Sequence, residues 1–370
     1  MVTMMKKICL FVGLLSILLA CPVYANVDSS AVSVGAVSGS FSATSGQKAD
    51  IEFELFEPGV VTIEILEPDE NVIRRIVGDD VYEPGKHILA WDGRDSAGNL
   101  VPNEVYTVRV VLKDKEGKLI AVAEPSAGTG GELLEVMNTE LADNHIGFQI
   151  SEPARVLVRI GIKDGPMLRN LLRWKPRTAG KNRVSWDGFD SSGVVDLRQD
   201  SKTTVMVAAH RLPDKSIIAY GNEEISYVNW FEDMKLEPKT VTPEEQALSR
   251  GDKRIAREYY RSVFQDREPQ IELKIIQAGK ALTEPYQLSE SAVLRINADE
   301  ASQWLLDESL YEVGFYVDGV FVSEEEQGYL PMSWRLNAKE YEAGDHVLTV
   351  NISGFDGRVG VASTVFSISE

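Results

Sequence analysis

The sequence contains almost no cysteine. Its two cysteines, Cys9 and Cys21, both lie near the amino terminus. The rest of the chain therefore has no thiols to form a disulfide, a CxxCH haem site or a cysteine-based zinc site. Buried apolar cores alone must hold such a chain together, and 370 residues are enough for about three domains of ordinary size.

Positive charge is also in short supply. The chain has 38 Lys and Arg against 57 Asp and Glu, which gives a net charge of -19. An acidic surface disfavours nucleic acid and anionic lipid as partners, because both repel negative charge. We therefore expect no nucleic-acid partner. A soluble acidic surface, a basic partner or divalent cations all fit this charge.

Only one long apolar run is present, from Ile8 to Ala20, and it is short for a membrane span. The basic residues Lys6 and Lys7 precede it, and the A-x-A-like sequence Val23-Tyr24-Ala25 follows it. This order predicts a signal peptide over residues 1–25 and an exported chain that is periplasmic, on the outer surface or extracellular. Because Leu18 to Cys21 resembles a lipobox, a lipid anchor at Cys21 is an open alternative. No transmembrane span is expected in the mature chain.

Motifs of catalysis are missing as well. The sequence has no G-x-S-x-G motif, no phosphate-binding loop and no pair of histidines at metal-ligand spacing. We expect no enzymatic activity, no catalytic residue and no cofactor. The four histidines are His87, His145, His210 and His346.

What the chain does contain is one unit written twice. FEPGVVTIEI and PGKHILAWDGRDSAG in the first copy correspond to SEPARVLVRI and AGKNRVSWDGFDSSG in the second. Trp91 corresponds to Trp186 and Gly85 to Gly180, so the register holds at 95 residues without a gap. A period of this length indicates tandem domains rather than a solenoid.

Within each copy, apolar residues alternate with polar ones, as in Ile51, Phe53 and Leu55. Short alternating runs separated by Asp-Gly and Pro-Gly turns predict antiparallel β-sandwiches. We therefore predict an all-β protein of three Ig-like β-sandwich domains in tandem with a short helical linker. After the signal peptide, the expected parts are a flexible lead-in (26–46), for which a first edge strand is the alternative, Ig-like domain 1 (47–127), the divergent repeat as domain 2 (128–228), a linker with a helix (229–268) and Ig-like domain 3 (269–370).

The helix is predicted from a capping box, Thr242 to Glu245, which has proline at the first helical position. Apolar residues that include Ile255 and Tyr259 follow near one helical face, and we expect them to pack against a neighbouring domain. The alternative is a helix that docks a partner through Ile255, Tyr259, Arg254 and Arg257.

The run from Val61 to Val110 contains Val61-Thr62-Ile63, Ile73-Arg74, Pro84-Gly85, His87, Trp91 to Asp95, Gly98, Val101-Pro102 and Tyr106. Through these residues the run resembles the Ig-like domain of the flagellar hook-capping (FlgD-type) family. The resemblance implies an Ig-like fold for the first copy and, in part, for the second. It implies little about function, because this module is reused in many exported bacterial proteins. One departure is Glu104, where the family usually has glycine.

Both copies contain a corner motif with tryptophan, two aspartates and two glycines. We expect the tryptophan to be buried, the aspartates to accept hydrogen bonds from turn amides and the glycines to take positive φ. A weaker alternative is a Ca²⁺ site formed by Asp92, Asp95 and Asn99. The motif consists of Trp91, Asp92, Gly93, Asp95 and Gly98 in the first copy, and of Trp186, Asp187, Gly188, Asp190 and Gly193 in the second.

Four aromatic residues lie outside the repeated motif: Trp174, Trp230, Trp304 and Tyr329. A row of them exposed on one sheet would favour glycan binding, whereas burial would favour packing between domains. From the whole sequence we expect a non-enzymatic scaffold, assembly or adhesion subunit of the cell envelope or surface, with a protein partner. The alternative is a carbohydrate-binding or substrate-positioning accessory of a secreted system.

Overall fold

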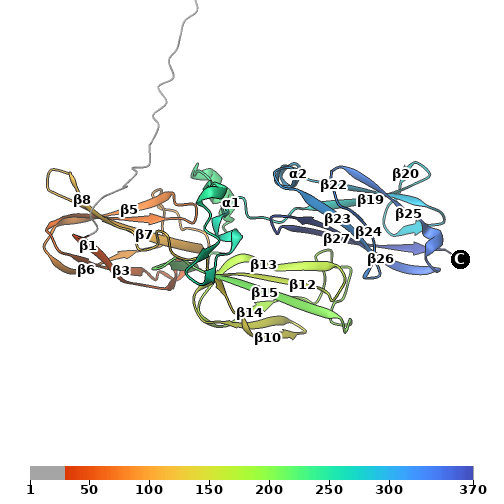
Figure 1. Ribbon diagram of the computed structural model, residues 1–370, viewed down its shortest axis with the longest axis horizontal. Coiled ribbons are helices and arrows are strands. Elements are labelled where there is room, and N and C mark those ends of the chain that lie inside the picture. The colour runs from red at the N-terminus through yellow and green to blue at the C-terminus, as the bar shows by residue number, and fades with distance from the viewer. Residues whose placement is uncertain (1–29, 370) are drawn as a thin grey trace, which may run out of the picture.

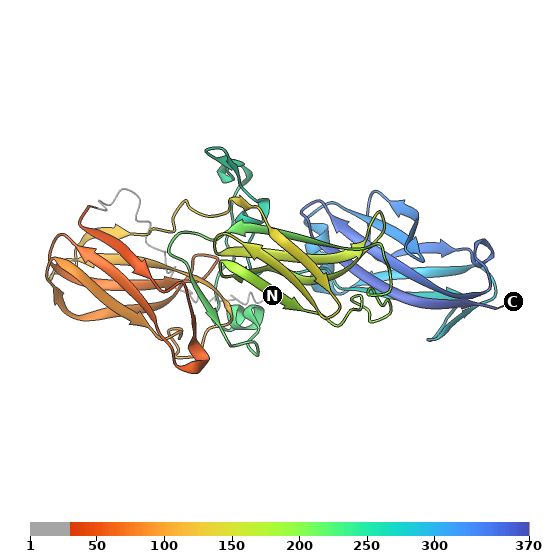
Figure 2. The ribbon, with the colours of Figure 1, turned by 90° about the horizontal axis from the view of Figure 1, so that it is seen from below.

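The computed structural model describes residues 30–369, which form three β-sandwiches (Figure 1). The predicted signal peptide and the alternative lipid anchor at Cys21 lie outside these residues. Seen from below, the three sandwiches lie in chain order along the long axis (Figure 2), whereas in Figure 1 the second lies below the other two and partly alongside the third. Within the part of the chain that is described, no helix has the length and apolar character needed to cross a membrane.

The first sandwich places the two sheets predicted from its alternating residues face to face. One sheet contains β1 (Val32–Val37), β3 (Ala49–Leu55) and β6 (Gly85–Trp91). The other contains β5 (Val72–Tyr82), β4 (Gly59–Leu66), β7 (Glu104–Lys113) and β8 (Leu119–Ala123). Ile51, Phe53 and Leu55 point inward and are buried, as their alternation predicts. The predicted flexible lead-in is wrong from Val32 onward, where the alternative holds, because β1 is an edge strand of this sheet.

Two short strands complete the second of these sheets. Strand β16 (Ile217–Tyr220) pairs antiparallel with β7 and parallel with β2 (Ser40–Ser42). It therefore lies in the first sandwich, although it follows all strands of the second in sequence. Ile217, Ile218 and Ala219 are all buried, which suits a strand covered on both faces. The predicted end of domain 2 at residue 228 is thus too late.

The second sandwich repeats the first at the predicted offset. Strand β13 (Met167–Arg177) lies 95 residues after β5, and β14 (Gly180–Ser185) begins 95 residues after β6. This agreement confirms the tandem repeat. Its sheets contain β10 (Met137–Ala142), β11 (His145–Ile150) and β14, and β13, β12 (Ala154–Ile162), β15 (Thr203–Arg211) and β9 (Leu133–Leu134).

The third sandwich has its own core, around Phe315, Leu294 and Phe366, and confirms the all-β fold class. A short helix, α2 (Glu300–Asp307), crosses one end. Its first sheet contains β20 (Lys280–Ala281), β19 (Ile271–Gln277), β22 (Ala292–Ala298) and β25 (Met332–Leu336). Its second contains β21 (Tyr286–Leu288), β27 (Val359–Ile368), β26 (Gly344–Gly354), β23 (Tyr311–Val317) and β24 (Val320–Glu325).

Residues 221–268, here called the joint segment, connect the sandwiches and differ from the prediction. The α-helix of this segment is α1 (Tyr227–Asp233), which lies upstream of the predicted one. The capping box at Thr242 is present, but it begins only a 3₁₀ turn over Pro243–Glu245. Beyond it, Gly251 takes φ 62° in a tight turn between β17 (Ser249–Arg250) and β18 (Lys253–Arg254). The helix predicted to carry Ile255 and Tyr259 is therefore wrong.

Candidate functional site

The corner motif of the first sandwich is a buried turn. The Trp91 side chain is fully buried, and its Nε1–H donates to the Arg94 carbonyl over 3.0 Å. Asp95 Oδ1 accepts the backbone N–H groups of Ala97 and Asn99 at 2.9 and 3.0 Å. Gly93 takes φ 74°. The motif thus closes one end of the sandwich by burial and by hydrogen bonds to turn amides.

The second copy also buries its tryptophan and hydrogen-bonds its turn amides to an aspartate, but the tryptophan donates to a carbonyl outside the turn. Trp186 is buried and donates to the Ala142 carbonyl at 3.0 Å. Asp190 Oδ1 accepts the N–H groups of Val194 and Val195 at 2.7 and 2.9 Å. The other oxygen, Oδ2, is buried without a hydrogen-bond partner. In this respect the two copies differ.

In the first copy, a residue of the joint segment donates a hydrogen bond to the corresponding oxygen, Asp95 Oδ2. Trp230 of α1 donates its Nε1–H to Asp95 Oδ2 over 3.1 Å. The Trp230 side chain is buried, as is Phe231 beside it, whose ring stacks on Phe264 at 4.6 Å. Both aromatics belong to the core cluster of the first sandwich. The corner motif therefore serves as the docking site for α1.

The turn between β4 and β5 holds the joint segment at a second place. Tyr227 donates its hydroxyl to Glu67, and Ser262 donates its hydroxyl to Asp69. Asn71 donates to the Glu237 carbonyl at 2.8 Å. Burial, together with the charge of Asp69, raises the pKa of Glu67 to about 7. This turn thus fixes the beginning, middle and end of the segment against the first sandwich.

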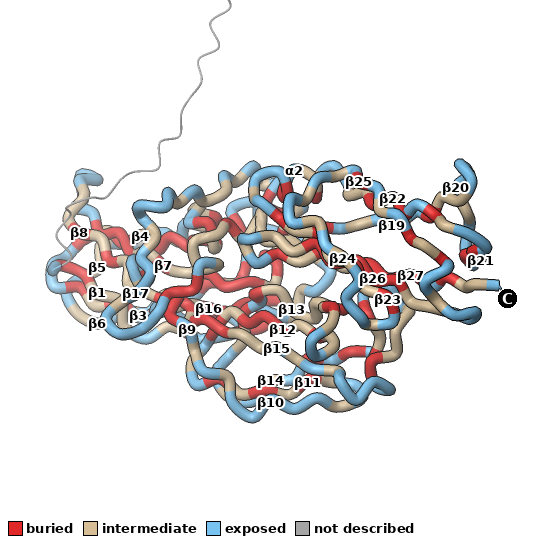
Figure 3. The backbone as a smooth tube through the Cα atoms, turned by 45° about the vertical axis from the view of Figure 1, so that its right-hand side comes forward, coloured by how far each residue is buried: buried red, intermediate tan, exposed pale blue. Residues whose placement is uncertain are grey.

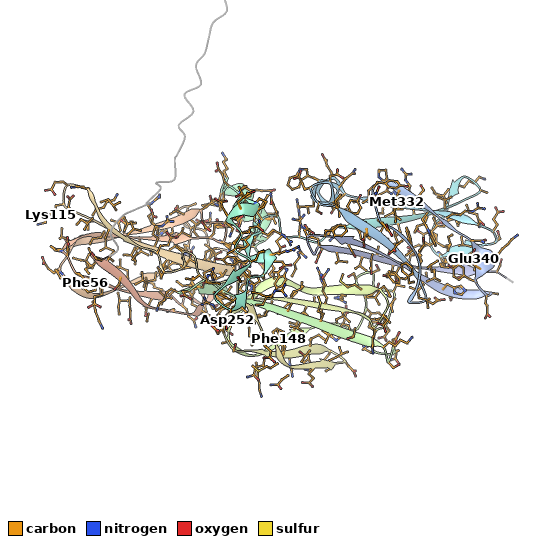
Figure 4. The ribbon with its side chains drawn as sticks, viewed as in Figure 1. Phe56, Lys115, Phe148, Asp252, Met332 and Glu340 are labelled. Atoms are coloured by element: carbon orange, nitrogen blue, oxygen red, sulfur yellow. The ribbon has the colours of Figure 1, made fainter. Side chains whose placement is uncertain are left out.

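Of the four residues predicted for partner docking, two contact the second sandwich and two are exposed. Ile255 is buried and forms a backbone bridge with Glu132. The Tyr259 hydroxyl donates to the Thr129 carbonyl at 2.6 Å. Arg254 and Arg257 are exposed. The apolar pair therefore packs inside the molecule, as the packing hypothesis requires, although not as a helix. Figure 4 labels Asp252 in the neighbouring β17–β18 turn, close to the second sandwich.

Glu132 also binds two arginines across this contact. Its carboxylate accepts from Arg211 at 2.9 Å and from Arg250. Burial alone would raise its pKa, but the hydrogen bonds from the two guanidinium groups outweigh burial and lower the pKa to about 2. Glu132 is thus ionised at neutral pH and ties the joint segment to strand β15.

The second and third sandwiches meet through polar contacts. The Asn351 side-chain amide accepts from the Met167 N–H at 2.9 Å and donates to the Met167 carbonyl at 2.8 Å. Glu268 accepts from Arg159 at 2.9 Å and from the Val359 N–H at 2.6 Å. Part of the outer edge of β13 is therefore covered by the third sandwich. The tube coloured by burial shows buried residues where the sandwiches meet, as well as inside each (Figure 3).

A groove of about 750 Å³ lies between the first and second sandwiches beside α1. We call it the basic groove, because six cations line it against three carboxylates. Two of the cations are paired: Arg155 with Glu104 at 2.9 Å and Arg173 with Asp266 at 2.8 Å. The other four have no carboxylate partner among the described residues. The six cations are Arg155, Arg173, Lys175, Arg177, Arg183 and Arg267, and the carboxylates are Glu104, Glu223 and Asp266.

Two aromatic residues of the predicted glycan set are buried at this junction. Trp174 is 7% exposed and lies in a β-bulge of β13, with φ 43°. Its ring packs on His210, at 5.1 Å between centroids, and burial lowers the pKa of His210 to about 3. Trp304 and Tyr329 of the third sandwich are 49% and 55% exposed. The four aromatics therefore form no exposed row.

The alternative calcium set has a different environment from the one that a metal needs. Both Asp95 oxygens accept hydrogen bonds from N–H groups, and Asp92 Oδ1 accepts the Arg94 N–H at 3.2 Å. Over residues 30–369, no three His, Cys, Asp or Glu side chains gather closely enough to hold a metal ion. The motif carboxylates thus act as acceptors for turn amides and for α1.

The comparison with protein families agrees with this architecture. Residues 38–128 match the model of the FlgD Ig-like domain. No protein of curated function matches the sequence.

Among solved structures, the FlgD protein of P. aeruginosa is 17% identical and covers 33% of this chain and 81% of its own, with a TM-score of 0.21. An endo-beta-1,4-mannanase from Thermotoga petrophila is 14% identical over 30% of this chain, with a TM-score of 0.22, and this chain spans only 22% of its length. The fibronectin(III)-like modules of Clostridium thermocellum CbhA are 9% identical and cover 91% of this chain and 94% of their own, with a TM-score of 0.19. These TM-scores are low, so the fold assignment rests on the strands described above. The family match shows that residues 38–128 are similar to an FlgD Ig-like domain.

Proposed function

We propose that this protein is a non-enzymatic exported scaffold, working as an assembly or adhesion subunit of the cell envelope or surface. The observation that carries this proposal is the way the sandwiches are joined. At each joint, buried side chains make specific hydrogen bonds where a flexible tether would have exposed backbone and few contacts.

The first joint, between the first sandwich and the joint segment, is fixed by burial of aromatic side chains. Trp230 is held by Asp95, and Phe231 lies in the core of the first sandwich. Burying large aromatic side chains stabilises such a contact by a few kcal/mol, which is enough to keep α1 docked. The first sandwich and the joint segment therefore behave as one unit in this proposal.

The second joint, between the second and third sandwiches, is fixed by ion pairs and by the hydrogen bonds of a side-chain amide. Glu268 binds Arg159 and Arg173 of the second sandwich and accepts the Val359 N–H of the third, and Asp266 adds a second ion pair to Arg173. Asn351 adds a pair of hydrogen bonds to the backbone of β13. A chain joined this way holds its outer surfaces at fixed spacing, which is what a scaffold or an assembly subunit requires.

The polar residues of the repeated motif support a binding role in place of catalysis. Asp95 accepts hydrogen bonds from amides and from Trp230, so its charge is used to hold structure. Ig-like modules commonly bind through strand edges, loops and grooves between modules.

The proposal is tested by crosslinking in cells, followed by mass spectrometry of what the tagged chain captures. We expect one dominant envelope or surface protein, and cell fractionation should find the chain outside the cytoplasm. The variant Trp230→Ala, which loosens the first joint, should lower that yield, while the exposed control Trp304→Ala should not. A chain retained in the cytoplasm, or one that captures no specific protein, would refute the scaffold role.

Glycan binding is a second candidate because Trp304 and Tyr329 are exposed on the third sandwich. Binding of the wild-type chain to a glycan array, lost in Trp304→Ala and kept in Trp230→Phe, would favour it over the scaffold.

A further inference from the structure

We propose that the basic groove binds a carboxylate-bearing, extended segment of a partner protein. This inference rests on the proposed function, since it names the chemistry by which the scaffold would recognise its partner. It concerns the four cations of the groove that no carboxylate balances: Lys175, Arg177, Arg183 and Arg267.

The first argument is the cost of placing these cations there. Arg177 is half-buried, and its guanidinium donates only to the neighbouring Pro176 carbonyl. Burial lowers the pKa of Arg177, since no carboxylate offsets the loss of water. The Arg267 Nε–H is buried without a hydrogen-bond partner. A guanidinium group in this position is stabilised when an anion reaches it.

The second argument is that these cations stand out in an acidic chain. The net charge of the chain is -19, and several of its partly buried arginines are paired with carboxylates, as Arg173 is with Asp266. Scattered surface charge would not gather unpaired cations on one side of a joint. The groove therefore combines positive potential with partial exclusion of water, and this combination strengthens an ion pair.

The third argument is that the groove is shaped by both sandwiches. The bulge in β13 turns Arg173 and Trp174 toward the joint. The opposite wall comes from the first sandwich, where Ile218 and Tyr220 of β16 line the groove. Its width therefore depends on the joint that α1 fixes, and a ligand in it touches both modules.

The walls favour a peptide over a sugar. Trp174 is buried against His210, so it offers no open face for a sugar ring. Tyr220 is the aromatic of the groove that remains exposed, at 47%. Aliphatic side chains such as Ile218 and Ile225 line the remainder and suit an extended peptide with apolar and acidic residues. The acidic surface outside the groove repels long polyanions, so a segment with a few carboxylates fits best.

The test is titration calorimetry of the full-length exported chain with a hexaglutamate peptide at low and at moderate salt, with hexaglutamine as the neutral control. We expect binding of hexaglutamate alone, weakened by salt. Arg177→Gln and Arg267→Gln should each weaken it roughly tenfold, because each removes one charge-assisted hydrogen bond. Arg335→Gln, which removes an exposed arginine of the third sandwich, should leave binding unchanged. Melting curves verify that each variant is folded.

Three outcomes would overturn the inference. In the first, hexaglutamate fails to bind the wild-type chain, and in the second, it binds Arg177→Gln and Arg335→Gln equally well. In the third outcome, trigalacturonate binds at the groove while the peptide does not, and the occupant is then an acidic sugar. The crosslinking experiment separates this failure from failure of the scaffold role. If Arg177→Gln captures the same partner at the same yield, the groove assignment is wrong and the proposed function stands.

Discussion

Trp230 donates its indole N–H to Asp95 Oδ2 over 3.1 Å, although 135 residues separate the two in sequence. This bond ties α1 to the corner motif of the first sandwich. In the second copy the corresponding acceptor, Asp190 Oδ2, is buried with no donor. The loop that carries it instead meets the third sandwich, where Ser192 accepts the Ser363 N–H at 2.8 Å. In both copies, the corner motif or its loop contacts a part of the chain that follows the second sandwich in sequence.

Two substitutions of Trp230 should separate the contribution of its apolar burial to stability from that of its hydrogen bond to Asp95. Trp230→Ala should destabilise the first sandwich by about 3–5 kcal/mol, because it leaves a large cavity. Trp230→Phe keeps most of the apolar area but leaves Asp95 Oδ2 unpaired, and should cost about 1–3 kcal/mol. Urea unfolding followed by circular dichroism measures both, with Trp304→Phe as the exposed control. Equal stability of Trp230→Phe and wild type would mean that the hydrogen bond contributes nothing.

The two glycines of the first corner motif should differ in their tolerance of alanine. Both have positive φ, 74° at Gly93 and 86° at Gly98, so both variants carry backbone strain. A Cβ on Gly93 would also overlap Ala43, whereas a Cβ on Gly98 meets open space. We expect Gly93→Ala to be the more destabilising by about 1–3 kcal/mol. Thermal melts of the two variants decide this, and an equal loss would refute the close packing at Gly93.

The joint between the second and third sandwiches should weaken when its side-chain amide is removed. Asn351→Ala loses both hydrogen bonds to Met167 and leaves the backbone groups of a buried edge unpaired, which should cost about 1–3 kcal/mol. In limited proteolysis, Asn351→Ala should be cleaved near residues 266–270 faster than the wild-type chain. Gln287→Ala, an exposed change in the third sandwich, should leave the cleavage rate unaltered. A rate that is the same in all three proteins would contradict the role of Asn351.

Acidification should strengthen the first joint through Glu67. Its pKa is raised to about 7 in the folded chain by burial and by Asp69, against 4.5 ordinarily. The folded state therefore binds the proton more tightly, and the resulting stability is present below pH 4.5 and lost as the pH rises through 7. Glu67→Gln imitates the protonated form and cannot titrate, so its free energy of unfolding should lack this part of the pH dependence.

The free energy of unfolding of Glu67→Gln minus that of wild type should thus increase from pH 5 to pH 8, by up to about 3 kcal/mol. Comparing the two proteins also removes the opposing effect of His210, whose pKa is lowered to about 3 and which destabilises the fold as the pH falls below 6.5. A difference that is constant over this range would show that Glu67 titrates normally.

The sequence predicted the parts of the fold that depend on local patterns. The alternation of Ile51, Phe53 and Leu55 and the offset of 95 residues specify strand positions, because the side-chain period and the spacing of turns are local properties. Residues whose partners are distant were harder to assign. Ile217 to Ala219 looked like the end of the second module, yet these residues pair with β7, more than one hundred residues earlier.

The joint and the basic groove could not be predicted, for the same physical reason. The helical stripe of Ile255 and Tyr259 is real as a pattern, but contacts with Thr129 and Glu132 favour a tight turn and a 3₁₀ helix. The cations of the groove come from strands β12 to β14 and from the end of the joint segment. Because they are dispersed in sequence, nothing local brings them together.

If the joints hold the three sandwiches at fixed spacing, small-angle X-ray scattering of the full-length chain should detect one rigid particle. The account predicts a single pair-distance distribution that matches the structure, and a broader one with a larger maximum dimension for the double variant Trp230→Ala, Asn351→Ala. A broad distribution for the wild-type chain, unchanged in the double variant, would contradict it.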